Sequence, residues 1–238
     1  MKAVYTDPIK TPLTFEQAEH VMRWALSTHL GKSERDVPDE VVALALAKTA
    51  LETGRWTAIW NDNWGNIKAG DRYEGMFTCI VLNEVLRRGG KDVVVWFAPE
   101  GELSAAPSKG GKLIAPPIPV PAGHPQTRMR AFANEFDGAD SYVEFVANGR
   151  YKAAWTALLR GEPVQYVHEL RLKGYFTADE ATYAKGVEAL FREMLSRIRK
   201  LPDVPEADVD WTLLRAQLPH LDFDWGIYRD ERDADLAG

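Results

Sequence analysis

The sequence contains a single cysteine, Cys79, which excludes an internal disulfide framework and a zinc site built on cysteine ligands. We expect Cys79 to be a small buried hydrophobic residue. The five histidines show no metal-ligand spacing, so we expect no metal and no cofactor. No run reaches the ~18 apolar residues of a membrane span. The formal net charge of −6 gives no positive surface for nucleic acid.

We also expect no secretory signal peptide, because the first residues lack its pattern. The first residues, MKAVYTDPIKTPLTFEQ, contain one early lysine, and Asp7 and Pro8 interrupt any apolar segment. A signal peptide requires a continuous apolar segment of about 7–15 residues. We therefore expect synthesis in the cytoplasm without a signal peptide.

What is present is a helical pattern with glycines at the expected helix ends. Thr14 and Gln17 form a capping box that predicts a helix to about Leu30, ended by Gly31. Apolar spacing and glycine or proline stops predict further helices at 38–53, 140–148, 151–160, 163–173 and 177–200, the last opened by a capping box at Thr177. The fold class is therefore α+β and mostly helical.

The β part is predicted between residues 76 and 132. The segments MFTCIVLNEVL and VVVWF are rich in β-branched residues and flank Arg87–Lys91, which predicts a hairpin, and 127–132 is a third strand. Residues 99–125 are rich in proline and glycine and predict an insertion in this lobe. We expect an N-terminal arm at 1–13, a body at 14–202 and an acidic extension at 203–238.

The helix predicted at 38–53 leads to the first candidate for chemistry, Glu52. Asp36 is expected as its N-cap and Pro38 as its first residue, and Gly54 suits its left-handed end. Glu52 then lies in the last turn, where the helix dipole and burial would both raise its pKa, as a general acid requires. The alternative is a solvated residue paired with Lys48 or Arg55.

Tryptophans and amides follow Glu52 closely. Aromatic faces stack on sugars as well as packing cores, so Trp60 and Trp64 are candidates for substrate binding, with core packing as the alternative. Asn63 and Asn66 are candidates for hydrogen bonds to an acetamide or carbonyl, with turn formation as the alternative. One carboxylate beside such residues is typical of a carbohydrate-binding cleft.

Five motifs in order resemble the bacterial cell-wall glucosaminidases of the lysozyme-like superfamily, of the flagellar-rod and autolysin type. The resemblance spans about residues 14–197. The motifs are Ala50-Leu51-Glu52-Thr53-Gly54, Asn63-Trp64-Gly65-Asn66-Ile67-Lys68-Ala69-Gly70, Arg128-Met129-Arg130-Ala131-Phe132, Asp140-Ser141-Tyr142-Val143, and Gly174-Tyr175 through Tyr183-Ala184-Lys185-Gly186-Val187.

The resemblance implies a lysozyme-like helical domain whose β-hairpin lobe faces the catalytic helix across a glycan groove. It implies that Glu52 is the proton donor and that Tyr183 lines the groove near it. A second catalytic acid in the hairpin is matched by Glu84, with Asp71 and Glu74 as alternatives.

The function that the resemblance implies is a peptidoglycan hydrolase acting on the glycan strand, in the first place an endo-β-N-acetylglucosaminidase. The alternatives are a muramidase or lytic transglycosylase on the same fold, and a non-catalytic glycan-binding or phage structural module. Without a signal peptide, a phage endolysin, a phage-tail lysin or a secretion-system effector fits. We expect a delivery partner, or lysis, to bring the protein to the cell wall.

Overall fold

The computed structural model describes residues 3–70, 72–80, 82–88, 90–98, 101–103, 125–176 and 178–201, with only the backbone of 82–88, 91–98, 101–103 and 125. The chain divides into two units, Met1–Lys200 and Leu201–Gly238. Most of the predicted insertion at 99–125 and the predicted extension at 203–238 lie outside the described residues.

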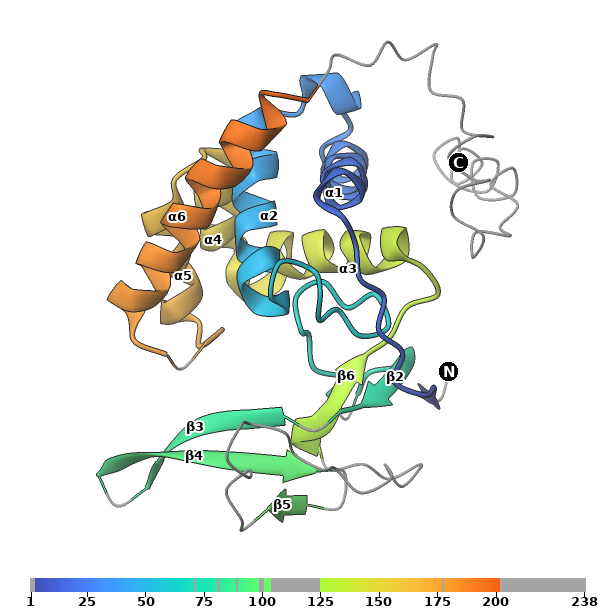
Figure 1. The fold of residues 1–238 in the computed structure, drawn as a ribbon, viewed down its shortest axis with the longest axis vertical. Coiled ribbons are helices and arrows are strands. Elements are labelled where there is room, and N and C mark those ends of the chain that lie inside the picture. Colours follow the sequence, from blue (N-terminus) through green and yellow to red (C-terminus); the bar gives the residue numbers. More distant parts are fainter. Residues whose placement is uncertain are drawn as a thin grey trace. The chain divides into compact units, whose positions relative to one another are not determined.

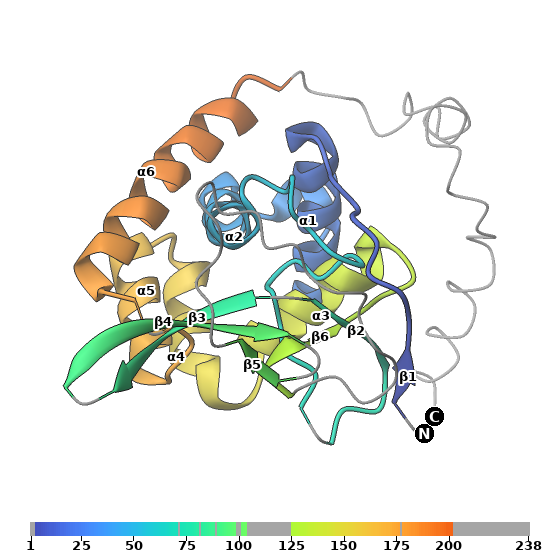
Figure 2. The ribbon, with the colours of Figure 1, turned by 60° about the horizontal axis from the view of Figure 1, so that its bottom comes forward.

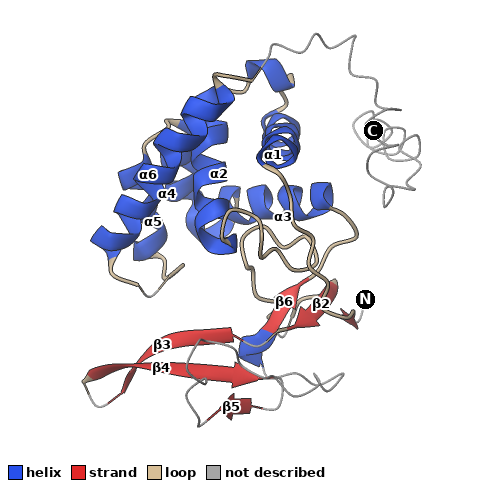
Figure 3. Cartoon of the chain, viewed as in Figure 1, coloured by secondary structure: helices blue, strands red, loops and turns tan. Residues whose placement is uncertain are grey.

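The described part is an α+β structure in which helices predominate, as predicted (Figure 1, Figure 3). Short 3-10 turns at Glu34–Asp36, Pro125–Thr127 and Gly149–Tyr151 join some of its elements. None of the described helices is both long and apolar enough to cross a membrane. The helices are α1 (Phe15–Leu30), α2 (Asp39–Thr53), α3 (Glu135–Ala147), α4 (Lys152–Leu159), α5 (Pro163–Leu172) and α6 (Glu180–Ile198).

Helix α2 is the centre of the helical body. Every residue from Val41 to Ala50 is buried, because the helix is apolar around most of its circumference. It packs against α1, α4 and α6, and Figure 2 shows it end-on between α1 and α6. The single charged residue in this buried stretch is Lys48, whose side chain has no exposed surface.

Two small sheets accompany the helices. In the first, β1 (Val4–Tyr5) lies parallel to β2 (Met76–Cys79), and β2 lies antiparallel to β6 (Arg128–Arg130). In the second, β3 (Leu82–Arg88) and β4 (Lys91–Ala98) form the predicted hairpin, and β5 (Gly101–Leu103) adds to β4. The prediction of one strand through residues 76–86 was wrong, since this segment is divided between the two sheets. β-branched composition indicates a strand but does not identify its partner.

The segment before α1 is tied to the loop that follows α2. The backbone N–H of Thr11 donates to the carbonyl of Ile59 (3.1 Å), and that of Asn61 donates to the carbonyl of Ile9 (2.8 Å). The side chain of Asn61 adds two bonds, accepting from the N–H of Ile9 (3.0 Å) and donating to the carbonyl of Asp7 (2.9 Å). These bonds position the loop that leads away from Glu52.

Some helix starts differ from their predictions. Thr14 and Gly31 cap α1 as predicted. The N-cap of α2 is Pro38, which offers no side-chain bond, whereas Asp36 lies in the preceding 3-10 turn. Helix α6 begins after Asp179, whose side chain accepts from the N–H of Thr182 (2.9 Å). The predicted cap Thr177 lies outside the described residues.

Helix α3 begins earlier than predicted, at Glu135, with Asn134 as its N-cap. Gly138 in its first turns disfavours a helix and concealed this start. The structure gives the reason for that glycine. A Cβ at Gly138 would lie 1.8 Å from the carbonyl oxygen of Asp62 and 3.0 Å from Cδ1 of Trp64.

We expect Gly138→Ala to lower the free energy of unfolding by at least ~2 kcal/mol, because the added methyl group overlaps the backbone carbonyl of Asp62. Gly70→Ala is the matched control, since nothing lies within 4 Å of a Cβ there. Urea denaturation of both variants measures the difference. Equal stability of the two variants would contradict the close packing of α3 on the loop.

Candidate active site

Glu52 lies in the last turn of α2, which ends at Gly54 with φ 56°. Its side chain is 23% exposed, and Nζ of the buried Lys48, one turn earlier, donates to its Oε1 at 2.9 Å. Arg55 pairs instead with Glu193 of α6, its Nη2 lying 2.7 Å from Oε2. Of the pairings that the sequence left open, the structure therefore contains the one with Lys48.

Tyr183 of α6 meets Glu52 across 131 residues of sequence, and its hydroxyl donates to the same Oε1. Its ring stacks on that of Phe176, with centroids 3.9 Å apart and an interplanar angle of 6°. No described residue donates to Oε2 of Glu52. One carboxyl oxygen is thus anchored by two donors, whereas no donor to the other is found among the described residues.

Aromatic rings surround the buried Lys48. Its Nζ lies 4.0 Å from the ring centroid of Tyr175 and 5.8 Å from that of Tyr183. Faces of aromatic rings attract cations, and this attraction is larger where water is excluded. The hydroxyl of Tyr175 donates to the carbonyl of Gly65 (3.1 Å), so the ring beneath Lys48 is itself held in place.

These contacts decide the ionisation of Glu52. Burial by itself would raise the pKa of Glu52, but the positive charge of Lys48 and the hydrogen bonds from Tyr183 and Lys48 outweigh it and hold the pKa below its usual range. The expectation of a raised pKa was wrong. It considered the partial charge of the helix dipole and burial, and not the full charge of an ammonium group in contact. Burial by itself would lower the pKa of Lys48, but the charge of Glu52, the nearby Tyr183 and Tyr166 and the hydrogen bond to Glu52 together outweigh it and raise that pKa.

The loop after α2 has an uncommon backbone. Five non-glycine residues have positive φ: Arg55 (57°), Trp56 (60°), Asn61 (48°), Asp62 (57°) and Asn66 (48°). Such conformations cost free energy and are retained where surrounding contacts hold them.

Asn66 is the predicted site residue of this loop that contacts Glu52. Its Nδ2 donates to the backbone carbonyl of Glu52 (2.8 Å), one of the carbonyls that a helix end leaves without an intrahelical partner. The amide therefore fixes the loop against the end of α2, next to the carboxyl group.

Asn63 and Trp64 stabilise the loop and the core. Asn63 is buried, and its Nδ2 donates to the carbonyls of Ile67 (2.9 Å) and Arg130 (3.1 Å). Trp64 has no exposed surface, and its Nε1 donates to the carbonyl of Glu135 (2.9 Å). Asn63 thus stabilises the turn and Trp64 packs in the core, which are the alternatives that the sequence left open. Both side chains are buried and leave no surface for a sugar.

Trp60 keeps part of its surface, with Nζ of Lys10 5.3 Å from its ring centroid. Glu84 lies in β3 opposite Val95, and its side chain lies outside the described residues, as does Asp71. Glu74 is exposed before β2. The second catalytic acid therefore stays a prediction.

Sequence reasoning missed a buried acid in the loop after α2, Asp62. Burial raises its pKa to about 7, with smaller contributions from Glu135 and Asp137, while a hydrogen bond from Thr11 acts in the opposite direction. Its sequence context, Asn-Asp-Asn, is that of an ordinary polar turn and carries no signal of burial.

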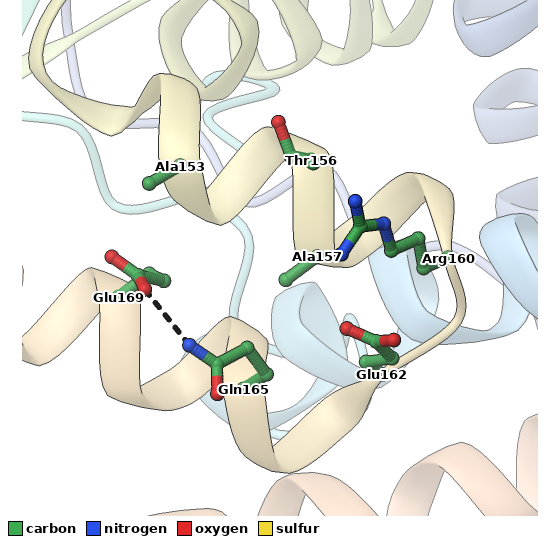
Figure 4. A pocket seen from close by; sticks show the side chains of 7 residues that line it. All are labelled: Ala153, Thr156, Ala157, Arg160, Glu162, Gln165 and Glu169. Carbon is green, nitrogen blue, oxygen red and sulfur yellow. Dashed lines mark hydrogen bonds between the residues drawn. The ribbon is translucent and has the colours of Figure 1, made fainter.

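Elsewhere in the described part, a shallow hollow lies between α4 and α5 (Figure 4). It adjoins the start of α2, because a Cβ at Gly161 would lie 2.9 Å from Cβ of Glu40. Glu52 lies at the other end of α2, about 18 Å away at 1.5 Å per residue. The hollow is thus separate from the Glu52 site. Its lining residues are Ala153, Thr156, Ala157, Arg160, Glu162, Gln165 and Glu169.

The described residues contain no group of three or more histidines, cysteines, aspartates or glutamates arranged to hold a metal ion. Cys79 is buried in β2, as predicted.

We expect Asp62→Asn to stabilise the protein increasingly as the pH rises. The folded-state pKa of about 7 exceeds the ordinary value of 3.8, so the wild type loses stability as pH rises from about 4 through about 7. The free energy of unfolding of the variant relative to wild type should increase by roughly 2–4 kcal/mol over that range. Urea denaturation at pH 4, 6 and 8 measures it, and a difference independent of pH would contradict the burial of an ionising Asp62.

No protein-family model and no curated protein matches this sequence. Two solved structures are similar to the chain. One is a peptidoglycan hydrolase mutant from Sphingomonas sp. A1, at 18% identity and a TM-score of 0.47, covering 76% of this chain and 93% of that one. The other is a C-terminally truncated glycoside hydrolase domain of FlgJ from Salmonella typhimurium, at 17% identity and a TM-score of 0.38, covering 75% and 98%.

Proposed function

We propose that this chain is a peptidoglycan hydrolase that cleaves the glycan strand, with Glu52 as its general acid. The observation that carries the proposal is the anchoring of one oxygen of Glu52 by Lys48 and Tyr183, which leaves Oε2 without a described donor. The ordered sequence motifs supply the substrate class, because Glu52 and Tyr183 both belong to motifs that resemble cell-wall glucosaminidases.

Cleavage of a glycosidic bond needs a proton on the leaving oxygen and stabilisation of an oxocarbenium-like charge. In our proposal Glu52 takes up a proton at Oε2 and donates it to the leaving oxygen. The carboxylate that forms is then stabilised by the donors already directed at Oε1, which need no rearrangement. The positive charge on the sugar is met by Glu84 or by the substrate's own acetamido group.

The finer activity that we propose is that of an endo-β-N-acetylglucosaminidase. A muramidase or a lytic transglycosylase would use the same acid and differ in the sugar end produced. The acid's role is therefore separable from the choice of bond, and the released fragments distinguish these activities.

A second candidate function is a non-catalytic glycan-binding module. The observation that favours it is the contact between Glu52 and the charged Lys48, because an ionised carboxyl group has no proton to donate. In that case the exposed part of Trp60 would contribute to binding, and the charge of Glu52 would have no effect on glycan chemistry.

We expect Glu52→Gln to lower the rate of peptidoglycan digestion by ~100-fold or more, the usual contribution of a general acid. The variant should also be less stable, because the buried Lys48 loses its carboxylate partner, so digestion is measured below its unfolding temperature. Glu188→Gln is the matched control, because Glu188 lies on α6 in an ion pair with Arg192. Mass spectrometry of the released fragments measures both rate and product.

The ends of the fragments identify the reaction. Reducing N-acetylglucosamine ends indicate a glucosaminidase, reducing N-acetylmuramic acid ends a muramidase, and anhydro-muramic ends a lytic transglycosylase. No release by folded wild type, together with glycan binding that Trp60→Ala weakens and Glu52→Gln leaves intact, would contradict the enzyme and support the binding module.

A further inference from the structure

We infer that Lys48 is a positioning residue that holds Glu52 as a carboxylate in the resting protein and thereby confines glycan cleavage to acidic conditions. The inference rests on the proposed function, since it concerns the regulation of the same site. The geometry that carries it is a completely buried ammonium group 2.9 Å from the carboxyl group of a partly exposed glutamate.

The burial of Lys48 makes this contact obligatory. Its side chain has no exposed surface, so its ammonium group is out of contact with bulk water. A charged group removed from water needs a partner of opposite charge or must become neutral. Glu52 is the carboxylate that contacts Lys48 in the described part of the chain, and the aromatic rings of Tyr175 and Tyr183 lie beside its ammonium group.

The other described groups that face Glu52 do not change charge near neutral pH. Tyr183 of α6 donates to Oε1, Tyr175 follows α5, and Tyr166 lies within α5. Burial has the largest effect on the pKa of each of these three tyrosines and raises it. Asn66 of the loop is neutral and binds the backbone carbonyl. Among the groups that face Glu52, Lys48 therefore has the largest influence on its ionisation, against the effect of burial.

The effect of Lys48 on the pH dependence of an acid catalyst has a definite direction. Glu52 donates only when protonated, and its protonated fraction falls as pH rises above its pKa. Lys48 lowers that pKa, so it moves the loss of activity toward lower pH. Without the ammonium group, burial is left as the largest influence and acts in the opposite direction.

The same contact assists the proton transfer itself. The O–H bond at Oε2 breaks, the new O–H bond forms on the glycosidic oxygen, and the bond between that oxygen and C1 breaks. Glu52 becomes a carboxylate again, which Lys48 stabilises at Oε1. Lys48 therefore makes the protonated form of Glu52 less abundant and a stronger acid, a compromise that sets the working pH.

The experiment is the pH dependence of kcat/KM for wild type and Lys48→Met, with glycan fragments as the readout. An opposite charge in contact lowers the pKa of a carboxyl group by roughly 1–3 units. We therefore expect the alkaline limb, the fall of activity toward high pH, to lie about one pH unit or more higher in the variant than in wild type. At neutral pH, the rate of Lys48→Met as a fraction of its own maximum should then be ~10-fold or more above the same fraction for wild type. Lys32→Met, at an exposed position beyond α1, is the matched control and leaves the limb in place.

A second measurement does not depend on activity. The Glu52 carboxyl carbon, assigned by its loss in Glu52→Gln, is titrated by ¹³C NMR in wild type and in Lys48→Met. We expect titration below the usual glutamate range in wild type and a higher midpoint in the variant. If Lys48→Met does not fold, the wild-type titration and Tyr183→Phe decide. Tyr183→Phe removes a neutral hydrogen-bond donor to Glu52. The alkaline limb of its activity should therefore shift in the same direction as expected for Lys48→Met, by a smaller amount.

The outcomes separate the two proposals. No cleavage at any pH by folded wild type would overturn the proposed function, and with it this inference. Cleavage with an alkaline limb that Lys48→Met leaves unmoved, or a wild-type Glu52 that titrates at or above its ordinary range, would overturn the inference while the proposed function stands.

Discussion

A fully buried ammonium group in the middle of the helical body is the constraint on which the site depends. Moving a charged group out of water costs several kcal/mol, and the cost is offset only by close partners in good geometry. For Lys48 these partners are the carboxyl group of Glu52 at 2.9 Å and the ring of Tyr175 at 4.0 Å. The packing of α6 and of the segment before it against α2 brings Tyr183 and Tyr175 to this charge.

The loop after α2 shows how a strained segment is held. Five of its non-glycine residues have positive φ. They are retained because the N-terminal segment is hydrogen-bonded along the loop and because Asn63, Trp64 and Asn66 bind carbonyl groups on three sides. The loop is thus a rigid support for the carboxyl group of Glu52, and its polar residues act mainly on the backbone.

Local sequence signals predicted the elements that carry their own caps. Thr14, Gln17 and Gly31 bracket α1, and Gly54 ends α2, because capping involves residues three or four positions apart. The start of α3 was not predicted, since Gly138 argues against a helix until Asp62 is known to lie against it. The division of residues 76–86 between two sheets was likewise not predicted, because strand partners are distant in sequence.

For the candidate site, the sequence by itself determined that a lone glutamate stands at the end of a buried helix, and its motifs indicated that Tyr183 would lie near it. The tertiary structure decided the ionisation of that glutamate, the burial of Asn63 and Trp64, and the raised pKa of Asp62. The physical reason is that spacing along the chain indicates which face a residue occupies. Desolvation and the field of a buried charge depend instead on every group packed around it, including a hydroxyl 131 residues away.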